Sequence, residues 1–148
     1  MADHTPFEYS RIDDNVFIGT NACCQMHYSQ MLTDHGITCD ISLEGEHIDE
    51  PYGAELFLWL PTDDHHAPDR RKVDVGIASL EAMLSKGCKA FLHCKNGHGR
   101  APTFYAAYLI KKRGLSPEAA LEWIKRARPT IHLEPEQLGF LQSLTQGG

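Results

Sequence analysis

The sequence lacks several features that would assign it to a membrane, secreted or repeat protein. It has no apolar segment near the roughly 20 residues that a membrane-spanning helix needs. Residues 1–5 show neither the basic nor the apolar region of a secretory signal peptide, and the chain has no internal repeat or low-complexity tract. With 148 residues, 42% hydrophobic and 23% charged, its composition is that of a globular protein with one core. We therefore expect a single domain over residues 1–148 and a cytoplasmic location.

Paired cysteines and metal-ligand spacings are also missing. The five cysteines are odd in number and form no framework, which favours a reducing compartment over a disulfide-stabilised fold. The nine histidines and five cysteines contain no Cys-x-x-Cys or His-x-x-x-His pair, so we expect no metal and no other cofactor. The net charge of −6 disfavours extended binding to nucleic acid or to an anionic membrane. We expect a monomer with neither kind of partner.

Apolar runs and helical patterns alternate along the chain. The apolar residues of segment 73–84 recur at helical spacing, which predicts a helix. Ser116 followed by Pro117 is typical of the start of another helix. The apolar run 55–60 predicts a strand buried on both faces. Strands are expected within 9–19 on both sides of a turn at 13–15, and at 37–43, 55–60 and 89–94; helices are expected at 21–35, 73–84, 100–113, 117–127 and 135–144. This order indicates an α/β domain whose mostly parallel central sheet of about four to five strands is flanked by helices.

The stretch from Ala90 to Pro102 carries the strongest chemical signal. An apolar strand stops at Cys94, a five-residue loop with two glycines follows, and Arg100 opens a helical pattern. Such a loop and helix N-terminus turn backbone N–H groups toward an anion. This environment favours the nucleophilic thiolate form of a cysteine. An arginine can donate two parallel hydrogen bonds to two oxygens of a phosphate. The stretch therefore predicts a site for attack on phosphorus, with phosphate bound by Lys95, Asn96, Gly97, His98, Gly99 and Arg100.

The order His93-Cys94, five residues, then Arg100 resembles the phosphate loop of the cysteine-based protein tyrosine phosphatases, most closely the small dual-specificity branch. Segments 9–19, 37–44, 60–64 and 128–141 are similar to the first strands, a core strand, the general-acid loop and the closing segment of that family. The resemblance implies a phosphate-binding loop between a core strand and a helix. It also implies hydrolysis through a phosphocysteine on Cys94, with phosphate held by Arg100 and the loop amides. The alternative, a buried structural cysteine, fits poorly with the lysine, glycines and arginine that follow.

The leaving group needs a proton donor, expected on a separate loop. Family-like Pro-x-x-Asp spacing favours Asp64, with Asp63 as runner-up; the alternative for both is a solvated loop or a helix cap. His93 stands at the strand end before the nucleophile, so its side chain should point away from the phosphate. We expect it to fix the loop by a hydrogen bond and so support the thiolate, or else to be an ordinary core histidine.

Two departures from the family pattern leave alternatives open. Ala101 stands where Ser or Thr usually follows the arginine and helps the thiolate leave, so a non-turnover phosphate-binding pseudo-phosphatase is one alternative; Thr103 need not compensate. Lys95 and His98 make the loop more cationic, which is similar to the inositol-lipid phosphatases. The substrate is therefore expected to be a phosphoprotein, carrying phosphotyrosine and possibly phosphoserine or phosphothreonine, or alternatively a phosphoinositide or other small phosphorylated molecule.

Two further groups allow both a functional and an ordinary interpretation. Cys39 or Cys88 could protect Cys94 as a disulfide partner under oxidation, although core packing is favoured for both. Segment 70–72, two arginines and a lysine at a helix start, could attract acidic substrates but is favoured as a solvated face. The pair at positions 23 and 24 is uninformative.

Overall fold

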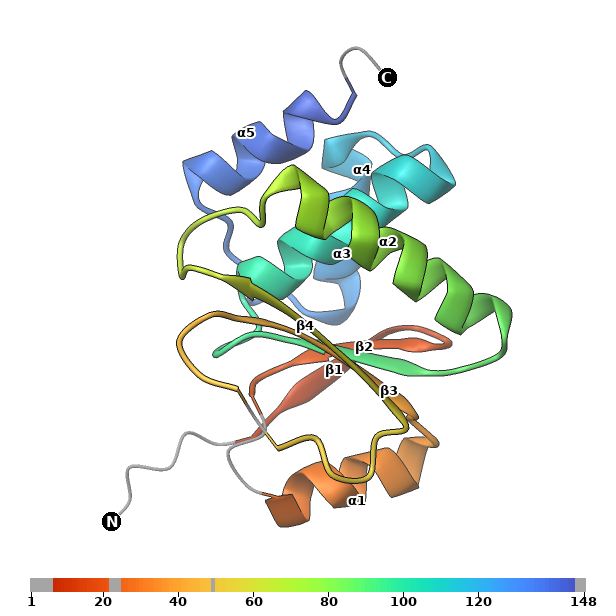
Figure 1. Cartoon of the computed structure of the whole chain (residues 1–148). Coiled ribbons are helices and arrows are strands. Elements are labelled where there is room, and N and C mark those ends of the chain that lie inside the picture. The colour runs from red at the N-terminus through yellow and green to blue at the C-terminus, as the bar shows by residue number, and fades with distance from the viewer. Residues whose placement is uncertain (1–6, 22–24, 49, 146–148) are drawn as a thin grey trace.

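The computed structural model describes residues 7–21, 25–48 and 50–145, and these form a five-stranded sheet with five helices (Figure 1). The strands are β1 (Tyr9–Asp13), β2 (Val16–Gly19), β3 (Cys39–Glu44), β4 (Leu56–Thr62) and β5 (Ala90–His93), and the helices are α1 (Gln25–His35), α2 (Arg70–Ser85), α3 (Arg100–Arg113), α4 (Pro117–Ala127) and α5 (Pro135–Ser143). Helix α1 covers one face of the sheet and α2 to α5 cover the other (Figure 1). No helix in the described part of the chain is long and apolar enough to cross a membrane.

The strand order β1-β2-β5-β3-β4 puts β5 at the centre of the sheet. β5 is parallel to both its neighbours, β2 and β3, and β4 is parallel to β3, whereas β1 pairs antiparallel with β2 through the predicted turn. All four residues of β5 are buried because helices cover both of its faces. The predicted α/β class with a mostly parallel sheet is confirmed.

Strand β4 is not buried on both faces as predicted. It lies at the edge of the sheet, where Leu56 and Trp59 stay 49% and 40% exposed. The apolar run could not distinguish a central strand from an edge strand, because the strand order is set by pairing with residues far along the chain. The Trp59 indole is instead held by a hydrogen bond from its Nε1 to the Glu44 carbonyl at 2.7 Å.

Helix α3 is the most buried helix of the described chain. Every residue from Arg100 to Ile110 is buried, because α3 lies between the sheet and helices α2, α4 and α5. Gly76 of α2 permits the close approach to α3: a Cβ at that position would lie 2.6 Å from the ring of Phe104. Arg100, at the start of α3, is therefore attached to a rigid part of the core.

The starts of helices α1 and α2 differ from the predicted positions. Residue 21 is not helical, and α1 is described from Gln25; residues 22–24, including the cysteine pair, lie outside the described residues. Helix α2 begins at Arg70, and Asp69 caps it by accepting a hydrogen bond from the Lys72 amide at 2.9 Å. Arg70 pairs with Asp74 one turn on at 3.1 Å. These contacts within the loop and helix favour the structural interpretation of the basic segment.

Candidate active site

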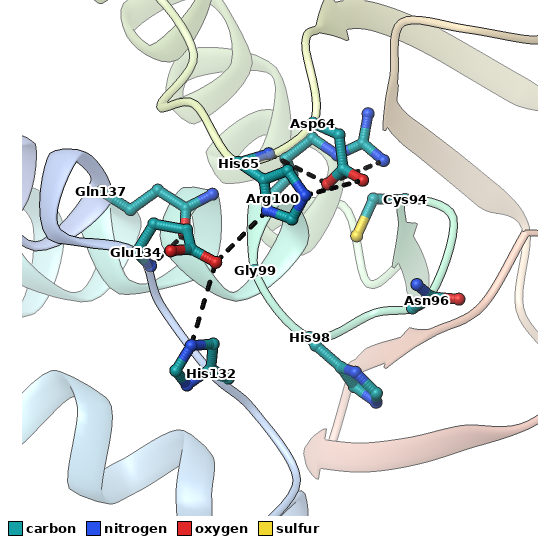
Figure 2. A pocket seen from close by; sticks show the side chains of 10 residues that line it. All are labelled: Asp64, His65, Cys94, Asn96, His98, Gly99, Arg100, His132, Glu134 and Gln137. Atoms are coloured by element: carbon teal, nitrogen blue, oxygen red, sulfur yellow. Dashed lines mark hydrogen bonds and ion pairs between the residues drawn. The ribbon is translucent and has the colours of Figure 1, made fainter.

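The end of β5 and the start of α3 enclose a small pocket (Figure 2). Cys94 follows β5 directly and Arg100 is the first residue of α3, so one core strand and one core helix fix the two ends of the loop. The pocket has a volume of about 150 Å³ and is lined by Asp64, His65, Cys94, Asn96, His98, Gly99, Arg100, His132, Glu134 and Gln137. This is below the about 300–1,000 Å³ of drug-sized ligand sites. It suits a phosphoryl group with the first atoms of its leaving group.

The carbonyl groups of residues 95–99 all accept hydrogen bonds from outside the loop. The Asn21 amide donates to the Lys95 carbonyl at 3.2 Å, and the His132 amide donates to the His98 carbonyl at 2.7 Å. Arg128 donates to the carbonyls of Asn96 and Gly97 at 3.1 and 2.8 Å. The amide and the hydroxyl of Thr103 donate to the Gly99 carbonyl at 2.8 and 2.7 Å. Within the described residues, no amide of 95–99 donates a hydrogen bond. Fixing the carbonyls outward leaves these amides free to bind an anion at the centre of the loop.

Gly97 is required by the conformation of this loop. Its φ of 72° lies in the left-handed region, and a Cβ there would come within 2.7 Å of Arg128 Nη2 and of the Gly19 carbonyl oxygen. The loop is therefore packed tightly against β2 on its outer side. Asn96, His98 and Gly99 line the pocket, whereas Lys95 is exposed and, like Gly97, does not line it.

Arg100 is buried and held by two acidic groups and one carbonyl. Its Nη1 donates to Glu46 Oε1 at 2.5 Å and to the Thr62 carbonyl at 2.8 Å, and its Nη2 donates to Glu46 Oε2 at 3.1 Å. Asp64 Oδ1 lies 3.5 Å from Nη2. Nε makes no hydrogen bond within the described structure, although it is buried, so the guanidinium retains a donor for a bound anion.

The charge state of this cluster is well defined. Burial alone would lower the pKa of Arg100, but the hydrogen bond to Glu46 and the negative groups of Cys94, Glu46 and Asp64 raise it above its ordinary value. The Arg100 hydrogen bond in turn lowers the pKa of Glu46. Arg100 is therefore a permanent cation beside Cys94, and Glu46 stays ionised into mildly acidic conditions.

Asp64 lies in the pocket and Asp63 does not. The Asp64 carboxylate lies over the Arg100 guanidinium (Figure 2), whereas Asp63 lines a separate hollow with Lys72 and Glu136. The Asp63 carbonyl accepts a hydrogen bond from the His66 amide at 3.1 Å. This bond closes the turn from which the Asp64 side chain enters the pocket. This placement favours Asp64 as the proton donor, in the order that the spacing predicted.

His93 lies outside the pocket, completely buried beneath it. Its Nε2 is 2.7 Å from Asp40 Oδ1 on β3, and Asp40 also accepts a hydrogen bond from the Tyr28 hydroxyl at 2.6 Å. Its ring stacks on Phe91 with centroids 4.9 Å apart. His93 therefore joins β5 to β3 just before the loop, which agrees with a supporting position facing away from the phosphate.

The other cysteines of the described chain are remote from Cys94. Cys39 pairs with Ala90 in the sheet, and four residues at about 3.3 Å each put it roughly 13 Å from Cys94 along β5. Cys88 lies before the same end of the strand. Burial, the largest of several causes, raises the pKa of Cys39 to about 11, so its thiol stays protonated and unreactive near neutral pH. The structure favours core packing over protection of Cys94 for both.

Among the described residues, no group of three or more His, Cys, Asp or Glu is arranged to hold a metal.

Two residues that support the site were not identified from the sequence. Glu46 lies in a polar, turn-rich segment whose position opposite Arg100 no local pattern indicates. Arg128 is 1% exposed and reaches Ser10 and Glu8 in addition to the two loop carbonyls. Arg128 lies in segment 128–141, which resembles the closing segment of the family, but its contact with the loop follows only from the fold.

Residues 16–146 match the family "Dual specificity phosphatase, catalytic domain". The chain is 29% identical over 147 residues to Phosphatidylglycerophosphatase and protein-tyrosine phosphatase 1 of Rattus norvegicus, covering 90% of this chain and 74% of the relative. It is 28% identical over 144 residues to Dual specificity phosphatase 28 of Mus musculus, covering 97% and 85%. A third match, Protein-tyrosine-phosphatase IBR5 of Arabidopsis thaliana, is 31% identical over 93 residues, which cover 61% of this chain but only 36% of that protein.

Solved structures agree with the sequence matches. The crystal structure of PTPMT1 superimposes with a TM-score of 0.82 at 27% identity, covering 93% of each chain. A complex of PTPMT1 with PI(5)P gives the same TM-score and identity, over 92% of this chain and 93% of that one. The chain therefore belongs to the dual-specificity phosphatase family and is an enzyme of the cysteine-dependent phosphatase class. The predicted family is confirmed.

Arg128→Lys is expected to loosen the loop. Lysine keeps the charge but lacks the planar fork that reaches several acceptors, so we expect the free energy of unfolding to fall by about 2 kcal/mol and inorganic phosphate to bind more weakly. Urea unfolding and competition by phosphate measure the two effects. Arg126→Lys, on the exposed surface two residues earlier, should change stability by less than about 0.5 kcal/mol. Equal behaviour of the two variants would show that Arg128 does not hold the loop.

Proposed function

We propose that this chain hydrolyses phosphomonoesters through a phosphocysteine on Cys94. The observation that carries the proposal is the placement of Cys94 and the positively charged Arg100 around a loop whose carbonyls are all bonded outward. A dianionic phosphoryl group in this loop would meet the free amides and Arg100. Groups fixed in this way stabilise the charge on the equatorial oxygens without reorganising during the reaction.

The reaction divides into two displacements. In the first, the Cys94 sulfur attacks phosphorus, the bond between phosphorus and the leaving oxygen breaks, and Asp64 gives its proton to that oxygen. In the second, water attacks phosphorus while Asp64 takes one of its protons. The S–P bond then breaks, the Cys94 thiolate is restored, and inorganic phosphate leaves.

Replacement of the nucleophile is the direct test of this proposal. Cys94→Ser is expected to abolish turnover of an aryl phosphate while it retains binding of inorganic phosphate, because the amides and Arg100 are unchanged. Phosphate release and isothermal titration with phosphate measure the two properties. Hydrolysis by the serine variant near the wild-type rate would show that Cys94 is not the nucleophile.

The proton donor is tested by comparing leaving groups. Asp64→Ala should lower kcat/KM, which reports the first displacement, by roughly 10²–10⁴-fold for an alkyl phosphate, which needs a proton on its leaving oxygen. It should have little effect on an aryl phosphate with a strongly acidic phenol. Asp63→Ala serves as the matched control and should leave both rates close to wild type. Equal losses from the two variants would overturn the assignment to Asp64.

The second displacement, hydrolysis of the phosphocysteine, is the step that the alanine at position 101 affects. Ala101 is completely buried in the first turn of α3, and the Thr103 hydroxyl is already committed to the Gly99 carbonyl at 2.7 Å. No hydroxyl of these two residues is therefore available to stabilise the departing thiolate. A chain that forms phosphocysteine but breaks it slowly would act as a phosphate-binding pseudo-phosphatase.

Ala101→Ser should accelerate this step. With an aryl phosphate as substrate, we expect the wild-type enzyme to release about one equivalent of the phenol in a burst, because phosphocysteine accumulates. The serine variant should show a smaller burst and a faster steady state, since its hydroxyl can donate to the leaving sulfur. Stopped-flow measurement of phenol release resolves both phases. A wild-type enzyme without a burst would show that Ala101 does not limit turnover.

The primary substrate proposal is a phosphoprotein in the cytoplasm, with phosphotyrosine and also phosphoserine or phosphothreonine accepted by a monomeric enzyme. The small pocket supports it, because little beyond the phosphoryl group is enclosed. The second candidate is a phosphoinositide or other small phosphorylated molecule. It is supported by the exposed Lys95 and His98 on the loop and by the likeness to PTPMT1, which was crystallised with PI(5)P. Parallel assays with phosphopeptides, soluble inositol phosphates and other small phosphate esters distinguish the two.

A further inference from the structure

The loop that carries Asp64 is held by the first turn of α5. Segment 63–68 connects β4 to α2 and is mostly exposed. Its contacts within the loop include the turn from the His66 amide to the Asp63 carbonyl. Besides the ion pair of Asp64 with Arg100, the loop is held from outside by residues about 70 positions away in the sequence, at Glu134, Glu136 and Gln137.

Three consecutive residues of the loop bind these side chains. His66 Nδ1 lies 2.9 Å from Glu136 Oε1, and the Ala67 amide donates to Glu136 Oε2 at 3.2 Å. His65 Nδ1 lies 3.3 Å from Glu134 Oε2 (Figure 2). Glu136 therefore binds the loop through both oxygens, one on a side chain and one on the backbone.

Gln137 connects the same turn to the phosphate loop. It is 1% exposed; its Nε2 donates to the His66 carbonyl at 3.1 Å and its Oε1 accepts the Glu134 amide at 2.8 Å, which caps α5. A Cβ on Gly99 would lie 3.2 Å from this side-chain amide. The start of α5 therefore contacts both the acid loop and the phosphate loop.

The backbone between these contacts adopts a conformation that needs support. His65 has a φ of 68°, in the left-handed region that residues with a side chain seldom occupy. It directly follows Asp64, so release of the contacts on either side of His65 would let the peptide relax and move the Asp64 carboxylate.

We propose that Glu136, His66 and Gln137 form a latch that positions Asp64 over Cys94 for proton transfer. These are positioning residues, because they act through the loop and do not touch the reacting atoms. The inference rests on the proposed function, since it assumes that Asp64 is the proton donor.

The latch depends on charge as well as on hydrogen bonds. The Ala67 amide and then His66 lower the pKa of Glu136, so this carboxylate stays ionised through the range in which imidazoles titrate. The charged groups that share the hollow with His66 are Glu136 from α5 and Asp63, Asp69 and Lys72 from the loop and α2. Around His65 they are Asp64, Glu134 and His132, with Arg100 across the pocket. His66 therefore faces an excess of negative charge.

Glu136→Ala tests the latch, with Glu118→Gln as the matched control. Glu118 is an exposed carboxylate that also bonds α5, through Gln142, but has no contact with the acid loop. Glu136→Ala should lower kcat/KM for an alkyl phosphate about tenfold, a part of the roughly 10²–10⁴-fold supplied by a positioned acid. It should change kcat/KM for an activated aryl phosphate less than about twofold. The control should change neither rate.

A double variant separates positioning from a general loss of stability. In an Asp64→Ala background, Glu136→Ala should cause no further fall in kcat/KM for the alkyl phosphate, because the latch acts only through Asp64. Additive losses would overturn the latch. A second readout is Glu136→Gln, which removes the charge but keeps an acceptor. It should restore part of the kcat/KM for the alkyl phosphate that Glu136→Ala loses. If Glu136→Gln restored nothing, hydrogen bonding by this side chain would not hold the loop.

The failure of the latch can be distinguished from failure of the proposed function. If Asp64→Ala shows no dependence on the leaving group, the acid assignment fails and the latch fails with it. If Asp64→Ala shows that dependence but Glu136→Ala behaves like Glu118→Gln, only the latch is overturned.

Discussion

The outward hydrogen bonds of the phosphate-loop carbonyls are the constraint on which the rest of the site depends. A short loop at the end of a buried strand cannot leave its peptide groups unpaired at random, because an unbonded buried polar group is costly. Here every carbonyl of residues 95–99 is bonded to a surrounding segment. The amides are consequently the groups left over, and they remain available to bind an anion.

The surrounding acids explain why a cationic site can exist in a chain with a net charge of −6. Arg100 is buried, and an unpaired buried guanidinium would be strongly destabilising. Glu46, the Thr62 carbonyl and Asp64 compensate its charge in the unliganded enzyme. The buried helix α3 fixes the Arg100 backbone, so these partners determine only where the guanidinium points. One arginine thus connects the phosphate loop, the segment after β3 and the acid loop.

Much of the architecture was predictable, because its signals are local. The apolar runs indicated β3 and β5, helical spacing indicated α2, and Ser116-Pro117 marked the start of α4, where the Ser116 hydroxyl accepts the Ala119 amide at 3.1 Å. The exposure of β4 was predicted wrongly, since an apolar run gives no information about its place in the strand order. The spacing of the acid loop favoured Asp64 over Asp63, and the pocket contains Asp64 alone of the two.

The sequence by itself determined the composition of the candidate site: a cysteine, a glycine-bearing loop and an arginine at fixed spacing between a strand and a helix. These residues are adjacent along the chain, so local geometry alone brings them together. Only the tertiary structure decided which groups hold them. Glu46 reaches Arg100 across 54 positions, Arg128 reaches the loop carbonyls across about 30, and Glu136 reaches the acid loop across about 70. Such pairings depend on how helices pack over the sheet, and the identity of the residues carries no local signal of it.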